Sequence, residues 1–98
     1  QYAAFVPIYR NFKMFYVYIL RSKFNNEYYI GSCNDIKKRL ILHNRGLVPS
    51  TKRYIPWSIV YIEEYKDLTN ARKRELQIKK WKSRFAIENL IKHFKISL

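Results

Sequence analysis

The chain has 98 residues, of which 20 are Lys or Arg and 7 are Asp or Glu, so its formal net charge at pH 7 is +13. This length fits one domain and leaves little room for a second. With 48% hydrophobic and 17% aromatic residues, the chain can bury a core, which excludes a disordered basic tail. Its single cysteine, Cys33, excludes an intramolecular disulfide and a zinc site built on thiolates, and it favours a reducing, cytoplasmic setting.

The positive charge is spread along the chain and interleaved with apolar residues, as on a folded surface. A field of this size indicates a polyanionic partner, nucleic acid first and an anionic membrane surface second. We expect nucleic acid, DNA rather than RNA, and no membrane partner. No apolar run approaches the roughly 20 residues that span a bilayer, so no membrane-spanning segment is expected. The alternatives are a basic face that only keeps the protein soluble and a basic surface that binds another protein.

Two strands are predicted near the start of the chain. Residues 15–20 (FYVYIL) are aromatic and β-branched, and residues 28–30 (YYI) form a second short run that Gly31 ends. The polar segment 21–26 between them favours a turn. The pattern therefore predicts an antiparallel hairpin.

A helix is predicted over residues 36–45, with Asn34 and Asp35 as candidate N-caps and Gly46 as the residue that ends it. Arg39 and His43 lie four residues apart, so they are neighbours on the surface of this helix. Ile36, Leu40 and His43 recur at i, i+4 and i+7 on one face of this helix, and Arg39 lies beside that stripe.

The second half of the chain is also predicted to contain a strand followed by helices. Residues 47–56 are predicted to be a basic loop, and residues 57–65 (WSIVYIEEY) a third strand. A helix with Asp67, Thr69 and Asn70 as candidate caps is predicted to run to about Lys82, and Ser83 is a cap for a last helix. The resulting element order is β-β-α-β-α-α.

Three large aromatic residues of this half have two interpretations. Trp57, Trp81 and Phe85 are expected to pack in the core, and the alternative is that they stack on nucleobases.

Glu75 occupies an unusual position in the helix that ends at Lys82. Ala71, Glu75 and Ile78 follow one another at i, i+4 and i+7, so the carboxylate lies along an apolar stripe. Burial of an ionised carboxylate is costly unless the group is paired or binds a metal. One interpretation is that Glu75 lies at the edge of the stripe and pairs with a nearby Arg or Lys, and the other is that it ligates a metal ion.

Two tripeptides carry a resemblance to a known family. The sequences YVY at 16–18 and YIG at 29–31 resemble the paired motif of the GIY-YIG nuclease superfamily, with Tyr18 and Tyr29 separated by 11 positions as in that family. Three further residues follow in the family's order: Arg39, His43 and Glu75. The resemblance runs from about residue 14 to 94 and is strongest to the small single-domain bacterial members that resemble the N-terminal domain of the excision-repair endonuclease UvrC.

The resemblance implies an α+β fold, with a small three-stranded antiparallel sheet flanked by helices. The nuclease domain is expected over residues 14–98, and residues 1–13 are expected to be an N-terminal extension of unknown role. Two positions depart from the family pattern: Tyr16 stands where the family's name has Gly, and Ser32 stands where some relatives carry Lys.

The resemblance also implies a catalytic set that meets in one pocket: Tyr18, Tyr29, Arg39, His43 and Glu75. Glu75 would hold one divalent ion, Mg²⁺ or Mn²⁺, which prefers hard oxygen ligands. Arg39 offers a planar fork to phosphate oxygens. Either tyrosine is a candidate general base, and nearby cations would favour the phenolate. His43 would relay a proton or hold the base by a hydrogen bond.

The expected function is a metal-dependent endonuclease that hydrolyses DNA phosphodiester bonds with low sequence specificity, in DNA repair or recombination. Selectivity for branched, nicked or single-stranded structure is a further expectation. Five basic residues are expected to contact nucleic acid: Lys38, Lys52, Arg53, Arg72 and Lys79. The alternative is a non-catalytic nucleic-acid-binding module on the same fold.

Overall fold

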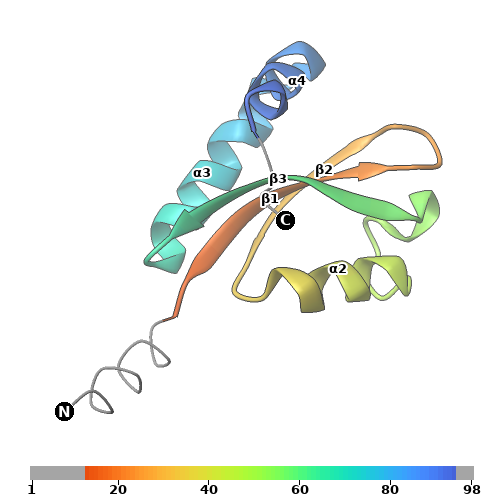
Figure 1. Cartoon of the computed structure of the whole chain (residues 1–98), viewed down its shortest axis with the longest axis horizontal. Helices are drawn as coiled ribbons and strands as arrows, with labels where there is room; N and C mark the ends of the chain where they lie inside the picture. The colour runs from red at the N-terminus through yellow and green to blue at the C-terminus, as the bar shows by residue number, and fades with distance from the viewer. Residues whose placement is uncertain (1–12, 95–98) are drawn as a thin grey trace.

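A computed structural model describes residues 13–94 (Figure 1). The predicted element order is confirmed, and a short 3₁₀ helix lies in the basic loop. The elements are β1 (Phe15–Ser22), β2 (Tyr28–Cys33), α2 (Ile36–Asn44), η2 (Lys52–Tyr54), β3 (Trp57–Tyr65), α3 (Leu68–Trp81) and α4 (Arg84–Lys92). The expected N-terminal extension, apart from Lys13, lies outside the described residues. None of the helices within residues 13–94 is long and apolar enough to cross a membrane.

The three strands form one antiparallel sheet in the order β2-β1-β3, so β1 is central and β2 is an edge strand. The expected α+β fold is therefore confirmed. The prediction that Gly31 ends the second strand is wrong, because β2 continues to Cys33 and Gly31 pairs with Tyr18 of β1. Likewise β1 continues past Leu20 to Ser22.

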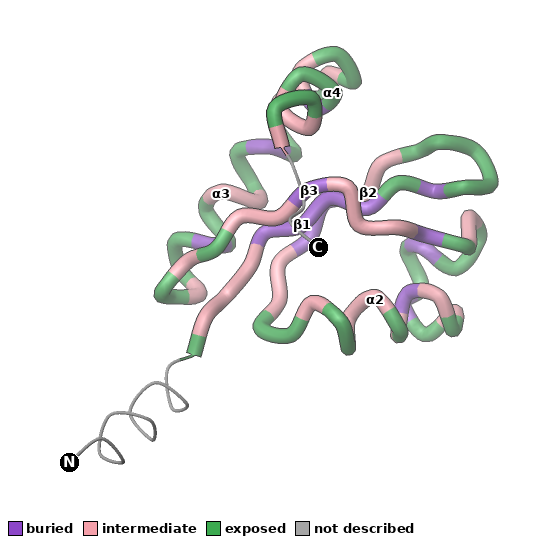
Figure 2. Tube along the Cα trace, viewed as in Figure 1, coloured by how far each residue is buried: buried purple, intermediate pink, exposed green. Residues whose placement is uncertain are grey.

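Helices cover both faces of the sheet, with α3 and α4 on one side and α2 on the other (Figure 1). The buried residues of the α3 face centre on Val17, Ile19 and Ile78. Those of the α2 face are Tyr18, Leu20 and Trp57. Successive residues of β1 alternate between the two clusters, as a pleated strand requires, and the central strand is the most buried part of the chain (Figure 2).

A bulge in β3 decides which of its side chains face which helix. Ile19 pairs with Tyr61 while the next residue, Leu20, pairs with Ile59, so Val60 is the extra residue. Odd-numbered residues before the bulge, such as Trp57, therefore pack on the α2 face, whereas Tyr61 after it belongs to the α3 cluster. Without the extra residue, Trp57 and Tyr61 would point to the same face of the sheet, and one of the two clusters would lose an aromatic side chain.

Each α-helix begins at a side-chain cap. Asp35 accepts a hydrogen bond from the backbone N–H of Lys38, Asp67 from that of Asn70, and Ser83 from that of Ala86. Lys82 ends α3 in a left-handed conformation at φ 46°. This residue turns the chain so that α4 follows α3 after only two residues.

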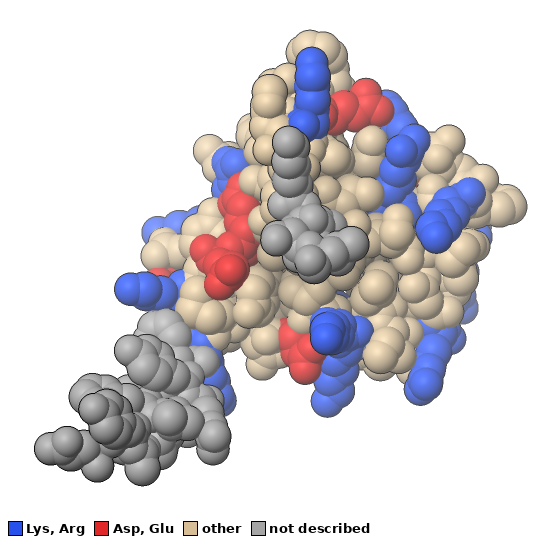
Figure 3. Space-filling view, in the orientation of Figure 1, with Lys and Arg blue, Asp and Glu red and all other residues tan. Residues whose placement is uncertain are grey.

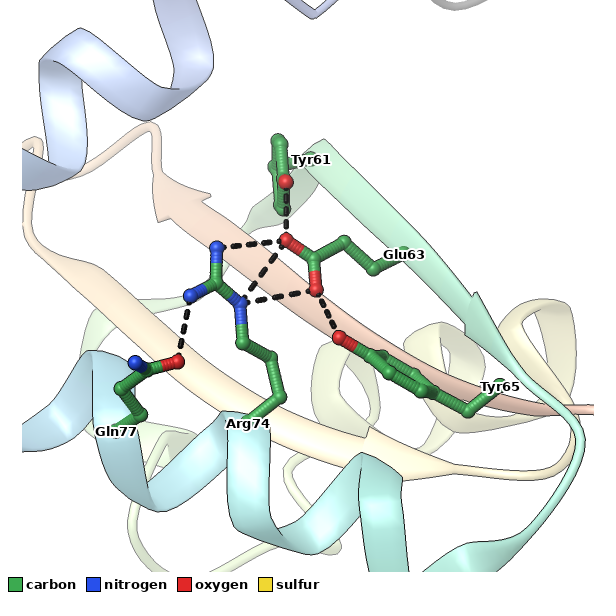
Figure 4. Close-up of polar contacts among 5 residues, drawn as sticks. All are labelled: Tyr61, Glu63, Tyr65, Arg74 and Gln77. Carbon is green, nitrogen blue, oxygen red and sulfur yellow. Dashed lines mark hydrogen bonds and ion pairs between the residues drawn. The ribbon is translucent and has the colours of Figure 1, made fainter.

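A polar cluster ties α3 to β3 (Figure 4). The carboxylate of Glu63 accepts hydrogen bonds from the hydroxyls of Tyr61 and Tyr65 (2.6 Å to Tyr65) and from the Arg74 guanidinium (3.0 Å from Nε and from Nη2). Burial alone would raise the pKa of Glu63, but the hydrogen bonds from Arg74 and the two hydroxyls hold it below its ordinary value. Since every acceptor position here is used, we assign the cluster to packing of the helix rather than to chemistry.

Replacement of Glu63 by Ala should lower the free energy of unfolding by about 2–3 kcal/mol, because it leaves a largely buried guanidinium without its acceptor. Glu64→Ala is the matched control, since Glu64 is exposed on the same strand. Urea denaturation of both variants measures the difference. Equal stability of the two variants would show that the cluster does not hold α3 on the sheet.

Candidate active site

Tyr18 lies at the centre of the candidate site, on the central strand and only 2% exposed. Its ring packs directly on the backbone of Gly31, its partner on β2. A Cβ atom at position 31 would lie 2.5 Å from the Tyr18 hydroxyl oxygen and 2.6 Å from the ring carbon that carries it. The close approach of the ring therefore requires glycine at position 31. The glycine of the YIG tripeptide leaves the space that the Tyr18 ring occupies.

The Tyr18 hydroxyl is joined to His43, which is fully buried on α2, with 2.9 Å between Oη and Nε2. On the other side of the imidazole ring, Nδ1 lies 2.7 Å from the Oγ1 of Thr51. The single Thr51 hydroxyl proton is donated to the carbonyl of Val48 at 3.3 Å, so Oγ1 accepts from His43. His43 therefore carries its proton on Nδ1, and the bare Nε2 accepts a hydrogen bond from Tyr18.

Burial fixes the charge states of this chain of hydrogen bonds. It lowers the pKa of His43 to about 4, with help from the nearby Arg39 cation. It also raises the pKa of Tyr18 to about 12, although the Arg39 guanidinium opposes that shift. At neutral pH both rings are thus uncharged, and Tyr18 holds its proton.

Tyr29 lies on the same face of the sheet as Tyr18 and is more exposed. Its ring centroid lies 5.0 Å from that of His43 in an edge-on arrangement, and 6.3 Å from that of Tyr18. Trp57 packs against it from β3 at 6.4 Å. The structure therefore brings both predicted tyrosines together, with Tyr29 nearer to solvent.

Arg39 completes this group from α2. Its Nε atom is buried and has no hydrogen-bond partner among residues 13–94. The side chain lines a groove of about 410 Å³ at the end of β2, whose other lining residues include Ser32 and Lys38. A buried cationic donor without a partner is costly in a folded protein, and a phosphate oxygen has the charge and geometry that would satisfy it.

Glu75 lies on the other face of the sheet from the two tyrosines. One carboxylate oxygen accepts a hydrogen bond from the Ser32 hydroxyl at 2.6 Å, and the other accepts from the Lys79 ammonium at 2.6 Å. The side chain is 17% exposed, and its pairing with Lys79 agrees with the first interpretation, that Glu75 lies at the edge of the stripe and pairs with a basic residue. Four of the five predicted residues thus cluster, and Glu75 approaches from across the edge strand.

Ser32 connects the two faces at that edge. It alternates with Gly31 and Cys33 along β2, so its side chain points toward α3 and meets Glu75. Yet Ser32 and Arg39 line the same groove. Because β2 has no strand beyond it in the sheet, a bound phosphate at this groove would meet the guanidinium from one face and the carboxylate environment from the other.

The donor set at Glu75 fits one divalent ion that keeps most of its waters. Within residues 13–94 no group of three His, Cys, Asp or Glu residues could hold a metal. A single carboxylate completed by waters and substrate oxygens is a common arrangement for Mg²⁺. A carboxylate has about four acceptor positions, and Lys79, whose side chain is 45% exposed, is free to leave its position when a cation approaches.

The five basic residues expected to contact nucleic acid lie at several places. Lys38 lines the groove beside Arg39, whereas Lys79 is engaged with Glu75. The other three are exposed: Lys52 and Arg53 on η2, and Arg72 on α3. Basic side chains occur over much of the surface, and the largest acidic patch in the view lies beside β3 and α3 (Figure 3).

Sequence reasoning did not find Thr51 or Ser32. Thr51 is a fully buried polar residue within a segment that was interpreted as a loop, and only the tertiary fold shows that it accepts from His43. The sequence did draw attention to Ser32, because this residue departs from the family pattern immediately after YIG. The alternation of side chains along an extended β2 would have placed it toward α3.

The chain matches the model of the GIY-YIG catalytic domain over residues 14–89. With the fold and the order of the site residues, this match shows that the chain belongs to the GIY-YIG family, which is a family of endonucleases. Nucleases of this family generally use divalent metal ions.

Two curated bacterial proteins are similar to this chain. UPF0213 protein SSP2268 of Staphylococcus saprophyticus is 40% identical over 65 residues, which cover 65% of this chain and 78% of that protein. UPF0213 protein CPE1444 of Clostridium perfringens is 38% identical over 68 residues, which cover 68% of this chain and 72% of that protein. No solved structure matches the chain.

Gly31→Ala should destabilise the protein by about 2 kcal/mol or more, because the new methyl group would overlap the Tyr18 ring. In a Tyr18→Leu background the same substitution should cost much less, since the overlapping atoms are gone. Chemical denaturation of the four proteins gives this coupling energy. An additive pair of effects would contradict the assigned contact.

The buried neutral His43 predicts acid sensitivity. Its folded pKa of about 4 lies below its ordinary value of 6.5, so its contribution to stability is complete above pH 6.5 and is lost as the pH falls toward 4. The loss should reach at most about 1.4 kcal/mol per pH unit. The free energy of unfolding of His43→Gln should lack this slope, and parallel curves for the two proteins between pH 7 and 4 would contradict the assignment.

Proposed function

We propose that the protein is a metal-dependent endonuclease that hydrolyses DNA phosphodiester bonds with low sequence specificity, and that it acts in repair or recombination. The observation that carries this proposal is the unpartnered Nε of Arg39, buried beside Tyr18 and lining the groove. A phosphate bound in this groove would be recognised through the sugar-phosphate backbone, which favours backbone shape over base sequence.

In this proposal the phenolate form of Tyr29 accepts the proton of the attacking water and becomes the neutral phenol. Tyr29 is the more exposed of the two rings, whereas Tyr18 is buried and uses its hydroxyl to donate a hydrogen bond to His43. The water oxygen forms a bond to phosphorus while the bond from phosphorus to the leaving oxygen breaks. Tyr18 and His43 are then positioning residues, which hold Tyr29 by ring contacts at 6.3 and 5.0 Å.

Arg39 would bind the non-bridging oxygens and stabilise the charge that develops on them. Glu75 would hold the divalent ion, with Ser32 orienting its carboxylate. When bound, such an ion supplies charge stabilisation and lowers the pKa of a coordinated water. Lys38, which lines the groove, would contact a neighbouring phosphate.

A non-catalytic nucleic-acid-binding module is the second candidate function. The observation that favours it is the pair of 2.6 Å contacts on Glu75, from Ser32 and Lys79, which occupies both carboxylate oxygens. In that case the basic side chains would bind phosphates, and Glu75 would serve only to connect α3 with β2.

Glu75→Gln separates the two candidates. Supercoiled, single-stranded and branched DNA are incubated with the wild-type protein and with the variant, in Mg²⁺, in Mn²⁺ and in chelator. We expect cleavage by the wild type with either ion, and a loss of at least about 10²-fold in the variant, because the remaining amide binds cations poorly. DNA binding should change by less than about twofold, since the substitution leaves every basic side chain that would contact phosphate in place.

Glu64→Gln is the control, because it removes the same charge from an exposed position on β3. Cleavage that persists in chelator would remove the metal and Glu75 from their proposed roles. Binding without cleavage by the wild type on every substrate would favour the non-catalytic module.

A further inference from the structure

The turn between β1 and β2 exposes an aromatic ring that the core does not use. Phe24 is 70% exposed. It stacks against Tyr54 of η2 with 6.4 Å between the ring centroids and 13° between the ring planes. We name these two residues the Phe24–Tyr54 pair. An exposed large apolar group calls for an explanation when it belongs to an ordered arrangement.

The backbone around this pair is held in place by hydrogen bonds of the Ser22 hydroxyl and of the main chain. The Ser22 side chain is fully buried, and its hydroxyl donates to the carbonyl of Tyr54 at 2.6 Å. The same oxygen accepts from the backbone N–H groups of Phe24 and Asn25 at 3.0 and 3.2 Å. In addition, the N–H of Lys23 donates to the carbonyl of Pro56 at 2.8 Å. The turn and η2 are therefore locked together, and the rings need no rearrangement to receive a ligand.

The charges beside the pair favour an anionic ligand. Lys23 precedes Phe24, and Lys52 and Arg53 precede Tyr54; all three are exposed. Glu27 is the acidic residue of the same turn, so the local balance is positive. Lys and Arg side chains are also prominent on this side of the molecule (Figure 3). Flat aromatic surface flanked by cations is the composition that binds single-stranded nucleic acid.

The pair also lies close to the candidate active site along the chain. Thr51, which accepts the hydrogen bond from His43, is the N-cap of η2, and Tyr54 is its last residue. A 3₁₀ helix rises about 2 Å per residue, so the backbone of Tyr54 lies about 6 Å along the helix axis from that of Thr51. The turn precedes β2 and the groove lies at the other end of that strand, so the six residues of β2, at about 3.3 Å each, place the turn roughly 20 Å from the groove. A single strand a few nucleotides long would span this distance.

We propose that the Phe24–Tyr54 pair is a stacking platform for one unpaired nucleobase of a nucleic-acid strand bound by this protein. The identity of the partner as nucleic acid rests on the proposed function. In a duplex, each base face is covered by the neighbouring base pair, so the platform favours single-stranded or frayed substrate over intact duplex. Lys23, Lys52 and Arg53 would contact the phosphates on either side of the stacked base.

The test measures binding of Phe24→Ala to a fluorescein-labelled single-stranded 15-mer and to its blunt duplex, by fluorescence anisotropy in chelator so that cleavage does not interfere. Base stacking on an aromatic side chain contributes about 1–3 kcal/mol. We therefore expect at least about 5-fold weaker binding of the single strand and less than about 2-fold change for the duplex. Phe24→Trp should bind the single strand at least as well as the wild type.

Phe85→Ala is the matched control. Phe85 is 80% exposed on α4, so its removal subtracts a comparable ring from a distant surface and should leave both affinities unchanged. The sequence-based expectation that Phe85 packs in the core is wrong. Circular dichroism of each variant verifies that it is folded, as expected for substitutions at exposed positions.

Equal effects of Phe24→Ala and Phe85→Ala on the single strand would overturn the proposal, and so would equal weakening of single strand and duplex. A change in sedimentation with unchanged DNA binding would identify a protein contact instead, and would also overturn it. If the wild type binds neither DNA, the proposed function fails together with this inference. If it binds DNA and Phe24 has no effect, only the stacking platform fails.

Discussion

The contact of the Tyr18 ring with Gly31 is the constraint on which the rest of the site depends. The ring lies so close to Gly31 that no side chain fits at position 31, and its hydroxyl is directed at His43. His43 in turn fixes the loop after α2 through Thr51. A single buried ring thus joins the central strand, the edge strand, a helix and a loop, and it leaves Tyr29 and Arg39 on the accessible side of the cluster.

The two faces of the sheet have different roles. On the α3 face, the hydrogen-bonded cluster around Glu63 and Arg74 ties α3 to β3 (Figure 4). Glu75, also on α3, lies at the opposite edge of the sheet, beside β2. The α2 face holds the rings and the guanidinium. Ser32 is the one residue of β2 that both bonds to Glu75 and lines the groove with Arg39, so the edge strand is where chemistry from the two faces would have to be combined.

Much of the fold follows from local patterns in the sequence. The strand and helix order, the caps at Asp35 and Ser83, and the burial of Ala71 and Ile78 beside Glu75 are set by short-range periodicity and capping, and the structure has them where they were predicted. The family resemblance identified the tyrosines, Arg39 and His43, which indeed lie together. The bulge at Val60 has no such signal, since an inserted residue leaves a strand-like composition unchanged.

Other features depend on contacts between distant segments. Gly31 is a strand breaker by composition, but its place is decided by the ring of Tyr18, thirteen residues earlier in the chain. The tautomer of His43 depends on Thr51, and the environment of Glu75 depends on Ser32, 43 positions away. Phe85 has the hydrophobic character of a core residue, yet the direction of α4 leaves it in solvent. None of these pairings can be derived from spacing alone.

Nitrogen NMR of the histidine side chains tests the central claim most directly. In protein labelled with ¹⁵N, long-range ¹H–¹⁵N correlations at pH 7 report which ring nitrogen of His43 carries the proton. The structure requires a neutral ring protonated at Nδ1, with a bare Nε2 that shifts when Tyr18 is replaced by Phe. A ring protonated at Nε2, or a His43 that is already charged at pH 6, would contradict the buried arrangement of Tyr18, His43 and Thr51 and the site built around it.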